Sequence, residues 1–228
     1  MLIAPRAALP SILALAALAV PVLVPAVARA WTPVPASTLD VTSGSIATLG
    51  SGALQTASPG MRAVERDRGR HAASALLRFR LRGPSAQTAP LGSGEVRRQI
   101  GLKLRAGDPC NLVYVMWRQF PERSIVVSAK RNPGQTTSAQ CGNRGYVDIA
   151  RVPRPGDPAA TDTADHRLEV RTRVRGDGTL VVTVVADGDT VLVQRVPAGL
   201  AQGLDGPAGV RSDNGRYRFR LSVANRGR

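Results

Sequence analysis

Cationic, amide and aromatic side chains recur at alternate positions in the middle third of the chain. Ile100, Leu102 and Leu104 supply one face of such a segment, which leaves Gln99 and Lys103 on the other. Arginine and lysine pair with carboxylate or sulfate groups, and aromatic rings pack against sugar rings, so this mixture suits an acidic sugar chain. The candidate binding residues are Arg97, Gln99, Lys103, Tyr114, Arg118, Ser128, Lys130 and Tyr146.

A solvated sheet face with charged ends is the alternative interpretation of these residues. The orientation of segment 111–119 is open, because both of its faces are apolar. With Val113 and Val115 toward the core, Tyr114 and Arg118 face the ligand side, and Asp148 joins them. Trp117 is interpreted as a core residue rather than as a platform for a sugar ring.

Catalysis on uronic acid chains would require more than binding. A lyase needs a group that neutralises the carboxylate and another that moves a proton. The neutralising group would be Arg97, Gln99 or Lys130, and the proton would move through Tyr114 or Tyr146. We therefore keep a polysaccharide lyase as an alternative to a binding protein.

Other catalytic and metal chemistry has little support in the sequence. A glycosidase needs two carboxylates about 5–9 Å apart, and the middle segments offer only Glu95 and Asp148. There is no Gly-x-Ser-x-Gly elbow, and His166 begins an alternating segment, so we interpret this histidine as structural. Asp187 and Asp189 are explained by a hairpin turn more simply than by calcium, and we predict neither a metal nor a cofactor.

Strict alternation of apolar and polar residues sets the fold class. Leu77, Phe79 and Leu81 alternate with arginines, and similar segments recur to residue 223. Gly/Asp loops at 176–178 and 187–189 are typical of tight hairpins. About ten strands without helical periodicity predict an all-β, two-sheet antiparallel sandwich, formed by a single domain at 31–228.

The last third of the chain resembles a known fold family. The segments HRLEVR (166–171), GDGTLVVTV (176–184), DGDTV (187–191), GPAGVRSD (206–213) and YRFRL (217–221) follow one another in the order of strand, two hairpins, turn and closing strand. This order is similar to the C-terminal half of the concanavalin A-like jelly roll, the fold of laminin-G-like and lectin/glucanase domains. The resemblance implies that ligands lie on a concave sheet built from segments 95–105, 111–119, 124–130 and 145–150.

The resemblance does not extend to catalytic residues. The Glu-x-Asp-x-x-Glu pattern of laminarinase-like hydrolases is absent, and so are the three motifs of alginate-lyase-like enzymes. Gln99-Ile100-Gly101 comes near one lyase motif but lacks its histidine. Fold resemblance alone does not fix an activity.

The first thirty residues predict export. A basic start at Arg6, an apolar stretch over 7–28 and the small-x-small triplet ending at Ala30 have the layout of a secretory signal peptide (1–30). The alternative is an uncleaved membrane anchor. Cleavage would leave a secreted or periplasmic protein that begins at Trp31 and has no transmembrane segment. In that compartment the only two cysteines, Cys110 and Cys141, predict a disulfide.

Charge points to anionic partners. The chain has a formal net charge of +15, which attracts polyanions. No nucleic-acid-binding motif is present, and aromatic residues make up 4% of the chain. Three arginine-bearing segments (78–82, 167–175 and 218–220) predict a basic outer face, which would need acidic partners or bound anions because adjacent like charges repel.

These observations favour a secreted, non-catalytic protein that binds carbohydrate, including acidic polysaccharide. The first alternative is a lyase acting on uronate-containing glycans. The second is a structural or adhesion module whose partner is a protein.

Overall fold

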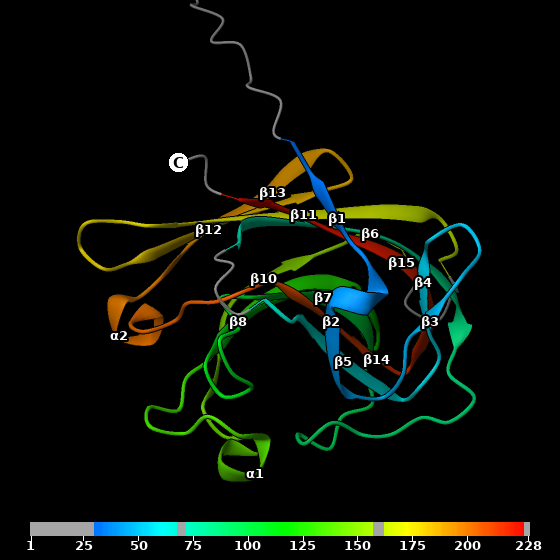
Figure 1. Ribbon diagram of the computed structural model, residues 1–228, viewed down its shortest axis with the longest axis horizontal. Coiled ribbons are helices and arrows are strands. Elements are labelled where there is room, and N and C mark those ends of the chain that lie inside the picture. Colours follow the sequence, from blue (N-terminus) through cyan, green and yellow to red (C-terminus); the bar gives the residue numbers. More distant parts are fainter. Residues whose placement is uncertain (1–29, 68–71, 157–161, 226–228) are drawn as a thin grey trace, which may run out of the picture.

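The computed structural model describes residues 30–67, 72–156 and 162–225. Two antiparallel sheets stack face to face (Figure 1), which confirms the predicted all-β sandwich. Apart from Ala30, the predicted signal peptide lies outside the described residues. Within the described ranges, no helix has the length and apolar character needed to cross a bilayer.

The upper layer in Figure 1 is an eight-stranded sheet. Its order is β13 (Asp189–Val196), β12 (Leu180–Ala186), β11 (Asp165–Val174), β6 (Ala72–Pro84), β15 (Gly215–Asn225), β4 (Leu54–Thr56) and β3 (Ala47–Thr48), with β1 (Thr32–Val34) also paired to β15.

The lower layer is a seven-stranded sheet. Its order is β10 (Tyr146–Pro153), β9 (Ser124–Lys130), β8 (Leu112–Phe120), β7 (Arg98–Leu104), β14 (Gly209–Asp213), β5 (Gly60–Glu65) and β2 (Leu39–Ser43).

The structure contains more elements than the roughly ten strands predicted. The additions are strands β1 to β5, of two to six residues, and three single-turn helices, η1 (Ala36–Thr38), α1 (Ser138–Cys141) and α2 (Ala198–Ala201). Elements of two to four residues, which include β1, β3, β4 and the three helices, are too short to display a hydrophobic period, so alternation could not reveal them.

The core lies between the two sheets and contains the apolar faces that alternation predicts. Phe79 of β6 meets Trp117 of β8 edge to face, with ring centroids 5.4 Å apart. Trp117 is 1% exposed and belongs to this core, as predicted. Successive side chains of a strand point to opposite faces. The polar residues that alternate with these core residues therefore lie on the two outer faces of the sandwich.

Candidate functional site

A pocket of about 320 Å³ lies on the outer face of the seven-stranded sheet. Strands β7, β8, β9, β10 and β14 supply its floor, and two loops supply the rest of its lining. The pocket is lined by Leu91, Gly92, Ser93, Arg97, Gln99, Tyr114, Met116, Arg118, Ser128, Asn143, Tyr146, Asp148 and Arg211.

Strand register places the floor residues next to one another. Gln99 of β7 is opposite Arg118 of β8, while Tyr114 of β8 is opposite Ser128 of β9. Ser128 is in turn opposite Asp148 of β10. Directly opposed side chains lie about 5 Å apart. The sheet therefore brings these five side chains, which come from four strands, together on one surface.

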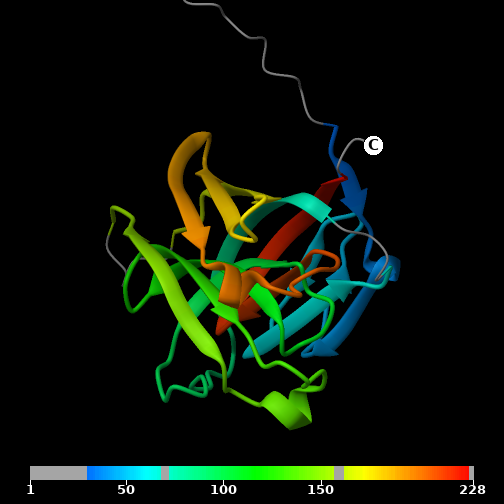
Figure 2. The ribbon, with the colours of Figure 1, turned by 90° about the vertical axis from the view of Figure 1, so that its left-hand side faces the viewer.

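Two loops cover part of this surface. In both views of the ribbon, segments 85–97 and 131–145 project from the seven-stranded sheet, away from the eight-stranded one (Figures 1 and 2). They touch at Gly92, where a Cβ atom would stand only 1.9 Å from the side-chain nitrogen of Asn143. A side chain at position 92 would have to displace the Asn143 amide, so glycine permits the contact that closes the pocket on this side.

Arg118 carries the least compensated positive charge in the pocket. Its side chain is 6% exposed, and its Nη2 atom lies 4.0 Å from Oδ2 of the exposed Asp148. Its Nε atom has no hydrogen-bond partner among the described residues. Burial, together with the guanidinium groups of Arg97 and Arg151, lowers the pKa of Arg118 to about 10, so the group is still charged at neutral pH.

The other two guanidinium groups of the pocket have close carboxylate partners. Arg97 Nη2 lies 2.5 Å from Glu95 Oε2, and this hydrogen bond lowers the pKa of the glutamate. Arg211 Nε donates to Asp213 Oδ2 at 2.9 Å. Gln99 Nε2 donates to the same oxygen at 2.7 Å, while Gln99 Oε1 has no partner in the described part of the chain.

Aromatic and cationic groups form a continuous row along one side of the pocket. The Arg211 guanidinium lies 5.2 Å from the centre of the Tyr114 ring, which stacks on Tyr146 at 5.8 Å. Lys130 Nζ lies 5.1 Å from the Tyr146 ring centre. Tyr146 is 39% exposed, whereas burial raises the pKa of Tyr114 well above its usual value. Tyr146 is therefore the exposed member of the row, and its hydroxyl group accepts from Arg211 Nη1 at 3.5 Å.

Six of the eight predicted binding residues line the pocket, and two lysines do not. Lys130 is buried and donates to the carbonyl oxygens of Pro109 (3.2 Å) and Gly142 (2.7 Å), beside the disulfide between Cys110 and Cys141. Lys103 lies on the same strand as Gln99 and is buried farther along it. The predicted disulfide is formed, and its turn supports the Tyr146 side of the pocket through Lys130.

Two charged residues in or beside the pocket were missed by the sequence interpretation. Arg211 and Asp213 belong to GPAGVRSD, which the resemblance assigns to a turn, whereas the residue pattern predicts a strand at 208–211. The structure forms strand β14 over Gly209–Asp213, between β5 and β7, so the turn is wrong for these residues. Val210 faces the core while Arg211 lies in the pocket. That local alternation was the available signal for their orientation.

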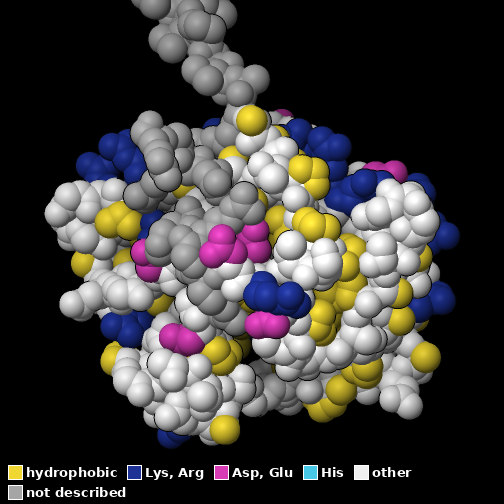
Figure 3. Space-filling view, viewed as in Figure 1, with side chains coloured by type: hydrophobic (Ala, Val, Ile, Leu, Met, Phe, Trp, Pro, Cys, Tyr) yellow, Lys and Arg dark blue, Asp and Glu magenta, His cyan; other side chains and the backbone are white. Residues whose placement is uncertain are grey.

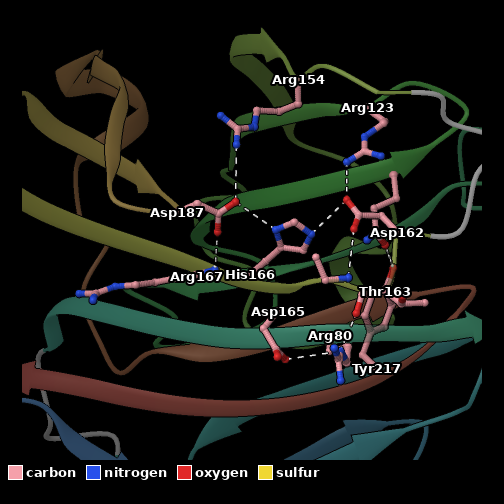
Figure 4. A network of polar contacts seen from close by, with 12 residues as sticks. Arg80, Arg123, Arg154, Asp162, Thr163, Asp165, His166, Arg167, Asp187 and Tyr217 are labelled. Carbon is pink, nitrogen blue, oxygen red and sulfur yellow. Dashed lines mark hydrogen bonds and ion pairs between the residues drawn. The ribbon is translucent and has the colours of Figure 1, made fainter.

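His166, for which the sequence favours a structural role, contacts the core and two carboxylates. Its ring packs against Trp117 at 4.7 Å, with Nδ1 lying 3.0 Å from Asp187 Oδ2 and Nε2 lying 3.1 Å from Asp162 Oδ2 (Figure 4). Arg154 also pairs with Asp187. The two carboxylates approach opposite sides of the ring, and no group of His, Cys, Asp and Glu within the described ranges is placed to hold a metal ion.

Comparison with solved structures identifies the fold. The chain is similar to the carbohydrate-binding module CBM66 from Bacillus subtilis, with a TM-score of 0.55 and 13% identity over 80% of this chain and 91% of that one. It is also similar to the metal-free Emp46p carbohydrate recognition domain, with a TM-score of 0.51 and 6% identity over 82% and 88%. The fold is therefore the concanavalin A-like jelly roll, as the resemblance implied.

Sequence comparison adds no closer relative. No family model matches the chain, and no curated protein matches it.

Proposed function

We propose that this protein binds carbohydrate without catalysis, and that its ligand is a polysaccharide carrying carboxylate groups. The observation that carries the proposal is Arg118, a buried guanidinium that lines the pocket and whose carboxylate neighbour, Asp148, is 4.0 Å away. A sugar carboxylate would supply the partner, because charge-assisted hydrogen bonds between guanidinium and carboxylate groups are strong and directional. The structural similarity to carbohydrate-binding domains is consistent with a glycan ligand.

The remaining pocket groups suit the uncharged part of a sugar. Gln99 Oε1 accepts hydrogen bonds, while Ser128 and Tyr146 offer hydroxyl groups that both donate and accept. Asp148 faces the same space and accepts from sugar hydroxyl groups. Small ligands are oriented by a few polar groups of this kind.

The lyase alternative has weaker support. Burial raises the pKa of Tyr114, so its phenolate, the form that would remove a proton, is disfavoured at neutral pH. Lys130 already donates to two backbone carbonyls and does not line the pocket, so it is poorly placed to neutralise a substrate carboxylate.

Calorimetric titration with matched oligosaccharides tests the proposal. We expect an oligogalacturonate to bind and the neutral oligogalactan of the same length to bind at least about tenfold more weakly, because only the former pairs with Arg118. Equal binding of the two, or no binding to any polysaccharide on a broad panel, would contradict the proposal and favour a protein partner. Growth of ultraviolet absorbance from new carbon–carbon double bonds would instead identify a lyase.

We further infer that the chain is exported and that residues 31–228 form one sandwich domain. The leader pattern at 1–30 and the disulfide between Cys110 and Cys141 support export, since disulfides persist mainly outside the cytoplasm. Sequencing the N-terminus of protein secreted by a bacterial host should find Trp31 first. Protein retained in the cytoplasm with its leader intact would overturn this inference.

A further inference from the structure

A second hollow, of about 750 Å³, lies on the outer face of the eight-stranded sheet, on the opposite side of the molecule from the pocket. We call it the arginine trough. Lys and Arg side chains gather along the upper margin of the molecule in Figure 3, where this sheet lies in Figure 1. The trough is lined by five arginines, Arg78, Arg80, Arg167, Arg218 and Arg220.

Strand register arranges these arginines in two rows that cross the sheet. In the first row Arg78 of β6 stands between Arg167 of β11 and Arg220 of β15. In the second row Arg80 stands between Asp165 and Arg218. The floor between the rows is formed at Phe79, His166 and Phe219. A trough with charged walls therefore crosses three strands, over about 10 Å at the usual strand spacing.

The first row juxtaposes three like charges, which destabilises a sheet unless an anion compensates them. Glu169 provides part of this compensation, because its Oε2 accepts from Arg167 Nη2 at 2.7 Å. Glu169 is itself shared with Arg171. The β15 side of the trough has a different set of partners.

Neutral acceptors orient the arginines on the β15 side. Arg218 Nη2 donates to Ser51 Oγ at 2.7 Å, and Arg220 Nη2 donates to the Ser51 carbonyl at 2.5 Å. These contacts hold the guanidinium groups in place without cancelling their charge. Arg80, in contrast, donates to the Thr163 carbonyl and lies 3.6 Å from Asp165 (Figure 4). The positive potential is therefore concentrated between Arg78, Arg218 and Arg220.

We propose that the arginine trough is a second binding site, which takes a linear anionic polysaccharide. The proposal does not depend on the function proposed for the pocket. A linear chain fits a trough between two charged walls, and guanidinium groups match carboxylate or sulfate groups in bidentate geometry. A flat bilayer surface would not reach the floor. Single-stranded nucleic acid needs exposed rings on which bases stack, whereas Phe79 and Phe219 are buried.

Two sites on opposite faces would let one molecule bridge two polysaccharide chains. The trough would bind mainly through charge, because its exposed lining is dominated by arginine. Its affinity should therefore fall steeply as ionic strength rises. Binding in the pocket, where the charged group is buried, should depend less on salt.

The test uses polygalacturonate as the probe and an Arg118→Gln background, which removes the charged contact of the pocket. Replacing Arg78, Arg218 and Arg220 with serine in this background should weaken binding by about tenfold, since each exposed charge contact contributes modestly. The matched control replaces Arg173, Arg175 and Arg195 with serine. These three exposed arginines belong to the same face or its hairpins and lie outside the trough. The control should change affinity by less than about twofold.

Equal losses of affinity for polygalacturonate in the two triple variants would overturn the proposal, because such losses would reflect the change in net charge alone. It would also be overturned if duplex DNA or anionic vesicles bound through these arginines and polygalacturonate did not. A second measurement avoids any folding defect: arginine-selective modification of the unmutated protein by phenylglyoxal, followed by mass spectrometry. Polygalacturonate should protect Arg78, Arg218 and Arg220, and unchanged modification of these three residues would contradict the proposal.

Discussion

Replacing Arg118 with glutamine should weaken binding of an oligogalacturonate by on the order of 100-fold, the effect of losing a charged hydrogen-bond partner worth about 2–3 kcal/mol. Arg118 is the pocket guanidinium without a close carboxylate, so its charge is available to the ligand. Binding of the neutral oligogalactan should change by less than about threefold, because that ligand has no group for the arginine to pair with. Calorimetric titration of both sugars measures the two effects.

Arg151→Gln provides the matched control. Arg151 is an exposed residue of β10, where it pairs with Glu122 and does not line the pocket. This substitution removes the same formal charge, so it reports the contribution of the long-range field. If Arg118→Gln and Arg151→Gln weaken binding equally, direct pairing at Arg118 is wrong. Thermal unfolding of both variants verifies that they remain folded.

Removing the disulfide by replacing Cys110 and Cys141 with alanine should lower the free energy of unfolding by about 3–4 kcal/mol. The bridge closes a loop with a sequence separation of 31 residues, so it restricts the unfolded chain considerably. The loss should also weaken ligand binding, because Lys130 contacts Cys141 Sγ at 3.2 Å and the Tyr146 ring at 5.1 Å. Denaturant unfolding of oxidised wild type and the double variant measures the stability difference.

A reductant serves as the control for the disulfide. It should destabilise the wild type and leave the double alanine variant unchanged. A loss of less than about 1 kcal/mol in the variant would show that the loop is held by other contacts, such as the hydrogen bonds between Asn111 and Asp108.

Local alternation predicted the parts of the site that depend on strand orientation. Ile100 faces the core, so alternation places Gln99 on the opposite face, where it lines the pocket. For 111–119 alternation left the orientation open, and the structure turns Val115 to the core and Tyr114 and Arg118 to the pocket. The period of two is a property of the extended backbone itself, which explains why it was readable without any tertiary information.

The missing parts of the site depend on contacts between distant segments. Arg211 reaches the pocket because β14 pairs with β7, more than a hundred residues earlier in the chain, and no local period encodes that pairing. Gly92 and Asn143 close the pocket through a loop contact. Lys130 is withdrawn from the pocket by carbonyl groups of Pro109 and Gly142. Alternation gives the face of a strand on which a side chain lies, and says nothing of what covers that face.

A crystal structure of the protein with an oligogalacturonate is the most direct test of the proposed binding mode. It should show a uronate carboxylate within about 3 Å of a guanidinium nitrogen of Arg118, with sugar hydroxyl groups reaching Gln99 and Tyr146. A well-ordered sugar bound only at other surfaces, with the pocket of the seven-stranded sheet left to solvent, would contradict it.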